Sequence, residues 1–254
     1  MKYKALMLDV DGTLIPYEYN ALPSQKVIDA ISRAVDKGII VCLVTGRAYE
    51  STKHILEALG LHAGVVVTNA GGGVFEIETA KPLYTQPIEP HDVDFAIELL
   101  QKHKIEFYVK NGMYDGAQKG VFKTGDAHDE VYMIFVNEDY TDLKIDEINK
   151  LFESRPHITV HKTKHKNPLN AGINLSHVNA TKLHGVEILM KHYNLKREEI
   201  IGVGDAYNDF PLLMASGLKV AMGNAIPELK EIADYVAPSV TDDGVADVIH
   251  KYIL

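Results

Sequence analysis

Short polar segments of this 254-residue chain stand where apolar runs end. These segments are Asp9 to Thr13, Thr45 to Arg47 and Gly204 to Asp209. If the preceding runs are parallel strands of one sheet, their carboxyl ends meet at one edge, where open α/β sheets bind ligands. Carboxylates of the first and last segments would then repel one another, and a divalent cation with a preference for hard oxygen ligands, Mg²⁺, would relieve that repulsion. The four carboxylates belong to Asp9, Asp11, Asp205 and Asp209.

Lys182 adds a positive charge at a place that favours negative ones. We interpret Asn179 as the N-cap of a helix, so that Lys182 lies in the first turn, where the helix dipole disfavours cations. A lysine at this position is explained if an anion lies between its ammonium group and the helix end. The crevice would then hold Mg²⁺ on one side, Lys182 and backbone N–H groups on the other, and a phosphate between them.

Each of these signals is common when it occurs alone. An isolated Asp-x-Asp usually forms a turn or a solvated loop. Thr45 alone is typical of a strand end or a helix N-cap, and Lys182 alone would be interpreted as a solvated surface lysine. Two roles remain open for Arg47: contact with a substrate, or an ion pair with a nearby acid that stabilises its own loop. Their joint position at strand ends and a helix start, with complementary charges, makes a functional site the better interpretation.

Apolar periodicity places these residues on alternating strands and helices. Continuous apolar runs predict strands at 5–8, 39–44, 64–67, 200–203 and 219–222. Apolar residues at helical spacing, as in Val27 to Val35, predict amphipathic helices between them. Buried strands that alternate with such helices are typical of a parallel sheet covered on both faces. We therefore predict an α/β fold with a Rossmann-like core.

A different pattern begins near residue 82, where prolines become frequent. The order from there is helix, two strands, helix, two strands, which predicts an α+β domain with an antiparallel sheet. This domain is inserted, because the segments on either side of it belong to one sheet. The expected division is core 1–81, inserted cap 82–177 and core 178–254. We interpret the basic segment His161 to Lys166 as a solvated loop, with contact to an anionic or polyol substrate as the alternative.

Composition excludes several classes of protein. The chain has 26 Lys and Arg against 35 Asp and Glu, a formal charge of −9, which does not fit a basic nucleic-acid binder. Cys42 is the single cysteine, so neither an intrachain disulfide nor a cysteine zinc site can form. The first apolar stretch stops at Asp9, too early for a signal peptide, and no window approaches a membrane span. We expect a cytoplasmic protein without nucleic-acid or membrane partners; the sequence does not indicate an oligomeric state.

The ordered motifs resemble those of the haloacid dehalogenase-like (HAD) hydrolase superfamily. Asp9 to Thr13 is similar to its first motif and Gly204 to Asp209 to its fourth, while Thr45 to Arg47 and Lys182 are similar to the second and third. The long insertion resembles the cap of the Cof-type branch of sugar-phosphate phosphatases. Two further segments resemble that branch, Met222 to Ala225 and Asp243 to Val245.

The resemblance implies a phosphoric monoester hydrolase that forms an aspartyl-phosphate. Asp9 would be the nucleophile and Asp11 the general acid and base. Mg²⁺ would be held by Asp9, the backbone carbonyl of Asp11 and Asp205, with Asp209 as a further ligand or as a residue that orients one. The residues that would hold the phosphoryl oxygens are Thr45, Gly46, Lys182 and Asn208.

The expected substrate is a small phosphorylated metabolite, with sugar phosphates as the first class to consider. A phosphomutase of the same superfamily and a catalytically silent phospho-sugar-binding protein are alternatives. A two-component receiver domain also uses acidic residues, a threonine and a lysine, but it is far shorter and lacks the insertion. Asp11 favours phosphate release, since P-type ATPases of the superfamily carry threonine at that position.

Overall fold

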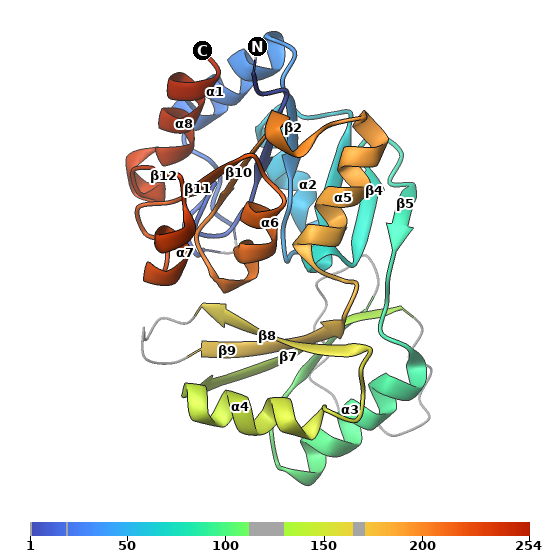
Figure 1. Ribbon diagram of the computed structural model, residues 1–254. Coiled ribbons are helices and arrows are strands. Elements are labelled where there is room, and N and C mark those ends of the chain that lie inside the picture. The colour runs from blue at the N-terminus through green and yellow to red at the C-terminus, as the bar shows by residue number, and fades with distance from the viewer. Residues whose placement is uncertain (1, 19, 112–129, 165–170) are drawn as a thin grey trace.

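The protein was analysed as a computed structural model that describes residues 2–18, 20–111, 130–164 and 171–254. Figure 1 shows a larger α/β layer that contains both chain ends, and a smaller layer below it built from the middle of the chain. The predicted fold class, a parallel-sheet core with an inserted α+β domain, is confirmed. Among the described helices, none combines the length and apolar character that crossing a membrane requires.

The core is a five-stranded parallel sheet with the order β12-β11-β10-β1-β2. Its strands are β1 (Ala5–Leu8), β2 (Ile40–Leu43), β10 (Ile200–Gly204), β11 (Leu218–Ala221) and β12 (Tyr235–Val236). The residues of β1 and β10 are all buried, as expected for continuous apolar strands between helical layers. The chain leaves β1 toward β2 on one side and returns to its other side as β10, so the strand order reverses at β1.

Six helices of the core layer cover this sheet, with α5 and α6 in front of the strands in Figure 1. They are α1 (Gln25–Asp36), α2 (Tyr49–Ala58), α5 (Lys182–Tyr193), α6 (Phe210–Met214), α7 (Pro227–Ile232) and α8 (Gly244–Tyr252). Helix α1 begins where the Ser24 side chain accepts a hydrogen bond from the Val27 N–H, the usual role of a serine N-cap. Its buried residues form one stripe toward the sheet, so amphipathic spacing fixes its orientation.

A short antiparallel sheet extends the core beyond β2. It contains β3 (Val65–Thr68), β4 (Gly73–Glu76) and β5 (Pro82–Thr85), and a parallel bridge from Val44 to Val67 links it to the end of β2. Gly71, in the turn between β3 and β4, has φ +108°, and a Cβ on it would collide with the backbone of Thr181. Glycine therefore lets this turn pack directly against the start of α5.

The inserted layer is an antiparallel sheet with the order β6-β7-β9-β8. Its strands are β6 (Tyr108–Asn111), β7 (Val131–Tyr140), β8 (Ile158–Lys164) and β9 (Ala171–His177). Helices α3 (Pro90–Lys102) and α4 (Asp142–Leu151) cover the sheet face that points away from the core in Figure 1, and a separate apolar cluster fills the space between them. The other face of the sheet is turned toward the core.

The change from one layer to the other follows β5, because β5 pairs with β4 on the core side. The division into core 1–81, cap 82–177 and core 178–254 stays a proposal, with one adjustment: β5 (Pro82–Thr85) belongs with the core sheet, so the first crossing lies between β5 and α3. The second crossing joins β9 to α5.

Candidate active site

Three buried carboxylates meet at the carboxyl ends of β1 and β10. The two strands pair in parallel with Leu8 opposite Val203, so Asp9 and Asp205 both lie just past the sheet edge. Asp209 follows on the next turn of chain, where its Oδ2 accepts hydrogen bonds from the N–H groups of Asp205 (2.8 Å) and Ala206 (2.9 Å). One carboxylate oxygen from each of the three aspartates lies within 4.8 Å of the others.

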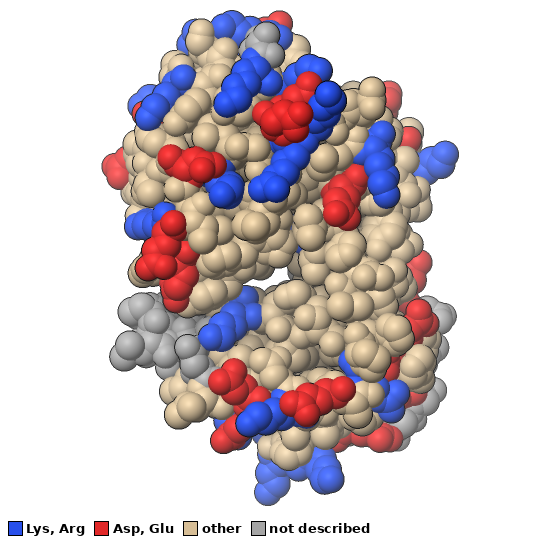
Figure 2. Space-filling model, in the orientation of Figure 1, with Lys and Arg blue, Asp and Glu red and all other residues tan. Residues whose placement is uncertain are grey.

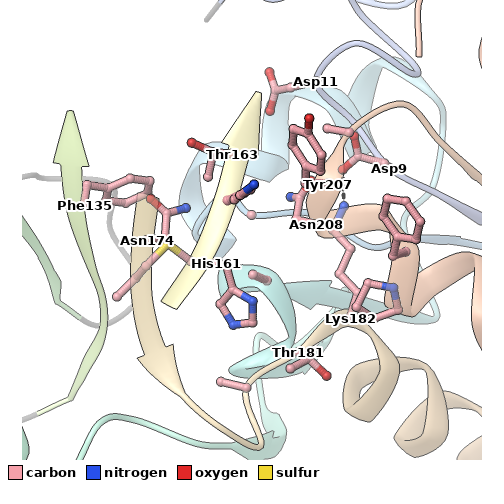
Figure 3. A pocket seen from close by; sticks show the side chains of 18 of the residues that line it. Asp9, Asp11, Phe135, His161, Thr163, Asn174, Thr181, Lys182, Tyr207 and Asn208 are labelled. Carbon is pink, nitrogen blue, oxygen red and sulfur yellow. Dashed lines mark hydrogen bonds and ion pairs between the residues drawn. The ribbon is translucent and has the colours of Figure 1, made fainter. Parts of the chain in front are cut away.

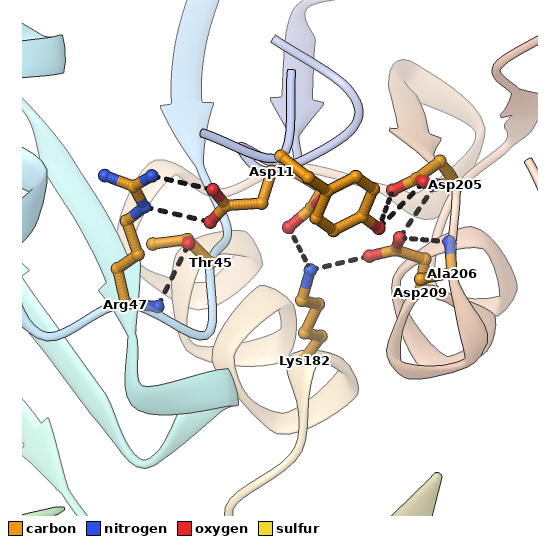
Figure 4. Close-up of polar contacts among 9 residues, drawn as sticks. Asp11, Thr45, Arg47, Lys182, Asp205, Ala206 and Asp209 are labelled. Atoms are coloured by element: carbon orange, nitrogen blue, oxygen red, sulfur yellow. Dashed lines mark hydrogen bonds and ion pairs between the residues drawn. The ribbon is translucent and has the colours of Figure 1, made fainter. Parts of the chain in front are cut away.

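Lys182 reaches into this cluster from the start of α5 (Figure 4). Its Nζ donates hydrogen bonds to Oδ1 of Asp9 at 2.5 Å and to Oδ1 of Asp209 at 2.6 Å. The lysine is 1% exposed, so its ammonium group has exchanged water for two carboxylates. The predicted N-cap, Asn179, is wrong: Thr181 caps α5, its hydroxyl accepting from the His184 N–H, and Lys182 is therefore the first residue of the helix.

The charges of the cluster do not balance without a cation. Burial and, after it, repulsion by the Asp209 carboxylate raise the pKa of Asp9 well above its usual value, while Lys182 opposes the shift. Burial lowers the pKa of Lys182, but the carboxylates of Asp209 and Asp9 outweigh it and raise that pKa above its ordinary value. When all are ionised, three carboxylates and one ammonium group leave two negative charges in a buried space.

This donor set fits a divalent metal ion. It consists of hard carboxylate oxygens close enough to share one ion, and its excess of two negative charges matches a dication. Among the described residues, Asp9, Asp205 and Asp209 form the one acidic group with such spacing.

Asp11 does not join the buried cluster and instead pairs with Arg47 (Figure 4). The guanidinium group binds the carboxylate with two hydrogen bonds, Nε to Oδ2 at 2.9 Å and Nη2 to Oδ1 at 2.7 Å. The Asp11 side chain is 33% exposed and that of Arg47 is 7% exposed. The acid that pairs with Arg47 is Asp11, which lies 36 positions away in the loop after β1 and not in the loop of Arg47, and Arg47 also lines the cavity described below.

The predicted phosphate-binding residues divide into two groups. Gly46, Asn208 and Lys182 line one cavity together with Asp9 and Asp11. Thr45 is fully buried beside them, and its hydroxyl accepts a hydrogen bond from the Arg47 N–H at 3.1 Å. In this arrangement the Thr45 hydroxyl supports the loop that carries Arg47.

Two residues outside the predicted set contact Asp205. The Tyr17 hydroxyl lies 2.9 and 3.2 Å from the two carboxylate oxygens of Asp205, to which it can donate. The Asn224 amide donates to the Gly12 carbonyl at 2.8 Å and to Oδ2 of Asp205 at 3.3 Å. Asn224 lies in a segment that resembles the Cof-type branch, whereas no spacing in the sequence singled out Tyr17.

A cavity of about 780 Å³ lies between the core and the inserted layer, and the space-filling view is hollowed at the same level (Figures 2 and 3). Its core side contains the acidic cluster and Lys182, and its cap side is formed by residues of β7, β8 and β9. His161, Lys162 and Thr163 line it, so this part of the basic segment 161–166 is a cavity wall and not the solvated loop we expected. Residues 165 and 166 lie outside the described part of the chain.

Comparison with known proteins identifies the family. A family model described as haloacid dehalogenase-like hydrolase matches residues 6–249, and the chain belongs to this family. It is 27% identical to 5-amino-6-(5-phospho-D-ribitylamino)uracil phosphatase YcsE of Bacillus subtilis, over 99% of this chain and 96% of the relative. It is 25% identical to a phosphoglycolate phosphatase of Methanothermobacter thermautotrophicus, over 98% of this chain and 99% of the relative.

A solved structure described as the HAD subclass IIB sugar phosphatase BT4131 shares the fold, with a TM-score of 0.78 at 22% identity and 98% of each chain covered. The expected membership of the haloacid dehalogenase-like hydrolases is thereby confirmed. The expected enzyme class, a phosphoric monoester hydrolase of the HAD type, agrees with the family and with the named relatives.

Proposed function

We propose that the protein is a Mg²⁺-dependent phosphatase that hydrolyses small phosphorylated metabolites through an aspartyl-phosphate on Asp9. The observation that carries the proposal is the buried group of three aspartates at the ends of β1 and β10, two of which, Asp9 and Asp209, are bridged by Lys182. A nucleophilic carboxylate, a divalent-cation site and a buried cation in one place are what phosphoryl transfer requires. The named relatives, all phosphatases, favour phosphorylated sugars, polyols or small acids as substrates.

In the first half of the reaction, an oxygen of Asp9 forms a bond to phosphorus while the ester bond to the leaving group breaks. Lys182, the Gly46 N–H and the Asn208 side chain would hold the phosphoryl oxygens, since all three residues line the cavity around Asp9. Bound Mg²⁺ would supply shielding of the negative charges on the phosphate and the carboxylates. Its ligands would be Asp9, Asp205 and the Asp11 carbonyl, with Asp209 as a further ligand or as a residue that orients the site.

In the second half, water replaces the aspartyl ester. Asp11 would first give a proton to the leaving oxygen and then take one from the attacking water, so it ends the cycle as it began. Asp11 also lines the cavity, and its two hydrogen bonds with Arg47 restrict where its carboxylate can lie. We therefore give Arg47 a positioning role.

The experiment that tests the proposal is release of inorganic phosphate from p-nitrophenyl phosphate and from a panel of phosphorylated sugars, polyols and acids. Phosphate release should require Mg²⁺, stop with EDTA, and be lost in Asp9→Asn while the thermal midpoint of unfolding stays near that of the parent. Activity retained in Asp9→Asn would remove Asp9 as the nucleophile. Phosphate release without an added sugar bisphosphate separates this function from a phosphomutase, and binding without release would indicate a phospho-sugar-binding protein.

We also propose a cytoplasmic location. It is supported by the single cysteine, Cys42, which is buried and free.

A further inference from the structure

The cap wall of the cavity contains a row of three side chains drawn from three neighbouring strands. Phe135 of β7 is opposite Asn174 of β9, and Asn174 is opposite His161 of β8. Residues directly opposite one another in antiparallel strands point to the same face of the sheet. All three line the cavity, and Figure 3 shows them side by side on the strands that face Asp9 and Lys182.

The row offers one aromatic face and two hydrogen-bonding groups without a formal charge. The Phe135 ring can stack on a flat partner, and the Asn174 amide carries a donor and an acceptor side by side. Burial lowers the pKa of His161, which favours the neutral imidazole, and its Nε2 lies 3.1 Å from the Ser176 hydroxyl. The interaction with Ser176 leaves Nδ1 as the ring nitrogen that remains for another partner.

Apolar side chains form part of the walls around this row, beside the polar side chains of Lys162 and Thr163 on β8. Met133 lies two residues before Phe135 on the same face of β7, and Val160 also lines the cavity. Tyr207 and Phe210 line the core side, at the end of β10 and the start of α6. A simple sugar phosphate needs a polar partner at each hydroxyl, because a buried hydroxyl without one is costly. A flat ring gains from the same apolar walls.

The cavity also has room for more than a phosphorylated sugar. Its volume of about 780 Å³ lies in the upper part of the range of roughly 300–1,000 Å³ that holds drug-sized ligands. The phosphate end is fixed by Lys182 and the acidic cluster, so the row on the cap lies where the distal part of the leaving group would be.

We propose that the leaving group carries a flat, uncharged, nitrogen-containing ring on its sugar or polyol, and that Phe135, Asn174 and His161 bind this ring. The inference rests on the proposed phosphatase function and defines its substrate class more narrowly. Phe135 stacks on the face of the ring, while Asn174 and His161 form hydrogen bonds with the polar atoms along its edge.

The test compares substrates that differ only by the ring. Uridine 5′-monophosphate is paired with ribose 5-phosphate, and riboflavin 5′-phosphate is paired with ribitol 5-phosphate. In at least one pair, kcat/KM for the ring-bearing member should exceed that of its partner by tenfold or more, as stacking on one aromatic side chain can supply. Equal or lower values for the ring-bearing member in both pairs would overturn the inference.

Variants assign the preference to the row. Phe135→Leu should reduce the ratio within the responding pair to near one, chiefly by lowering kcat/KM for the ring-bearing member. Asn174→Leu should reduce the ratio as well. Phe107→Leu is the matched control, since Phe107 belongs to the same layer but packs against the interior cluster and does not line the cavity. A ratio that survives in Phe135→Leu while the variant keeps its thermal midpoint would contradict the role of Phe135.

Failure of the proposed function has a different signature. If no phosphate is released from any of the four esters or from p-nitrophenyl phosphate with Mg²⁺ present, the phosphatase proposal fails. Quenching of riboflavin 5′-phosphate fluorescence by the parent protein but not by Phe135→Leu still supports the ring site in that case. No quenching by either protein overturns the ring site too.

Discussion

Replacing Lys182 by methionine tests the electrostatic argument for the site most directly. Methionine keeps much of the length of the side chain and removes the ammonium group that bridges Asp9 and Asp209 at 2.5 and 2.6 Å. Removal of one partner from a buried ion pair costs about 3–5 kcal/mol, because the remaining charges stay buried. For a chain of this size each kcal/mol shifts the thermal midpoint by about 2–4 °C, so Lys182→Met should unfold roughly 6–20 °C below the parent.

The loss should also depend on pH. The pKa of Asp9 is raised in the folded protein, so the folded state binds that proton more tightly, and stability falls as pH rises from the unfolded toward the folded pKa. Lys182 is a group that lowers the pKa of Asp9, and removing it raises this pKa further. The variant should therefore regain part of its stability at acidic pH, and the gap in midpoint between variant and parent should be smaller at pH 5 than at pH 8.

The assay is thermal unfolding followed by circular dichroism at both pH values, with EDTA present so that no metal ion compensates the charges. Lys191→Met is the matched control, because Lys191 lies on the same helix α5 but is exposed. It should change the midpoint by no more than about 2 °C, the scale of a surface substitution. A Lys182→Met midpoint equal to that of Lys191→Met would refute the argument that the buried lysine balances the carboxylates.

Three further substitutions test the surroundings of the site. Arg47→Lys keeps the positive charge but loses the bidentate contact with the Asp11 carboxylate. We expect kcat for phosphate release to fall about 10²-fold while the thermal midpoint stays unchanged. An unchanged kcat would mean that Asp11 needs no positioning. Tyr17→Phe removes a hydrogen bond to the Asp205 carboxylate that a metal ion would have to displace in order to bind there. Calorimetric titration should therefore show Mg²⁺ binding up to about tenfold more tightly to the variant. Weaker binding would show that Tyr17 helps to hold the ion. Burial lowers the pKa of His161 in the folded protein, so the unfolded chain takes up a proton on this residue at a higher pH than the folded protein does. The contribution of the neutral His161 to stability is therefore complete above the pKa of the unfolded state. It is lost as the pH falls below that pKa, by up to about 1.4 kcal/mol per pH unit. His161→Gln should therefore lose less stability than the parent between pH 7 and pH 5 in urea titrations, and equal losses would place the titration elsewhere.

The part of the site on the core sheet could be predicted from sequence because its strands are buried on both faces. Ala5–Leu8 and Ile200–Gly204 are almost wholly apolar, so both stand out as strands although nearly 200 residues separate them. A parallel sheet then brings their carboxyl ends together whatever lies between them. The closeness of Asp9 and Asp205 follows from that rule.

Short or half-exposed elements were harder to predict. The hairpin strands β4 and β5 have four residues each, and β5 is not buried. Neither strand therefore shows the alternation of apolar and polar residues by which a half-buried strand is recognised. At the start of α5, Asn179 and Thr181 are both residue types that cap helices. The choice between them depends on which side chain reaches the free N–H groups, and in the structure it is that of Thr181.

Contacts made between distant segments could not be predicted by local reasoning. Tyr17 touches Asp205 across 188 positions of the sequence, and nothing near Tyr17 in the chain signals this contact. The row of Phe135, Asn174 and His161 forms only through the strand register of the inserted sheet. One signal was available: residues 159, 161 and 163 alternate along a single strand, which puts His161 and Thr163 on the same face.

The two connections between the layers lie beside each other, which constrains how the cavity can be entered. The Tyr84 hydroxyl at the end of β5 lies 3.5 Å from the carbonyl of Asn179, next to the start of α5, so the outgoing and returning chains run together on one flank of the molecule (Figure 1). On the side of the cavity formed by β8, the Lys162 ammonium group lies 5.8 Å from the Tyr207 ring, and none of the described segments connects the two layers there. The core and the inserted layer are therefore connected along one flank, and a rotation about that flank would widen the cavity most on the side of β8, where a substrate would enter.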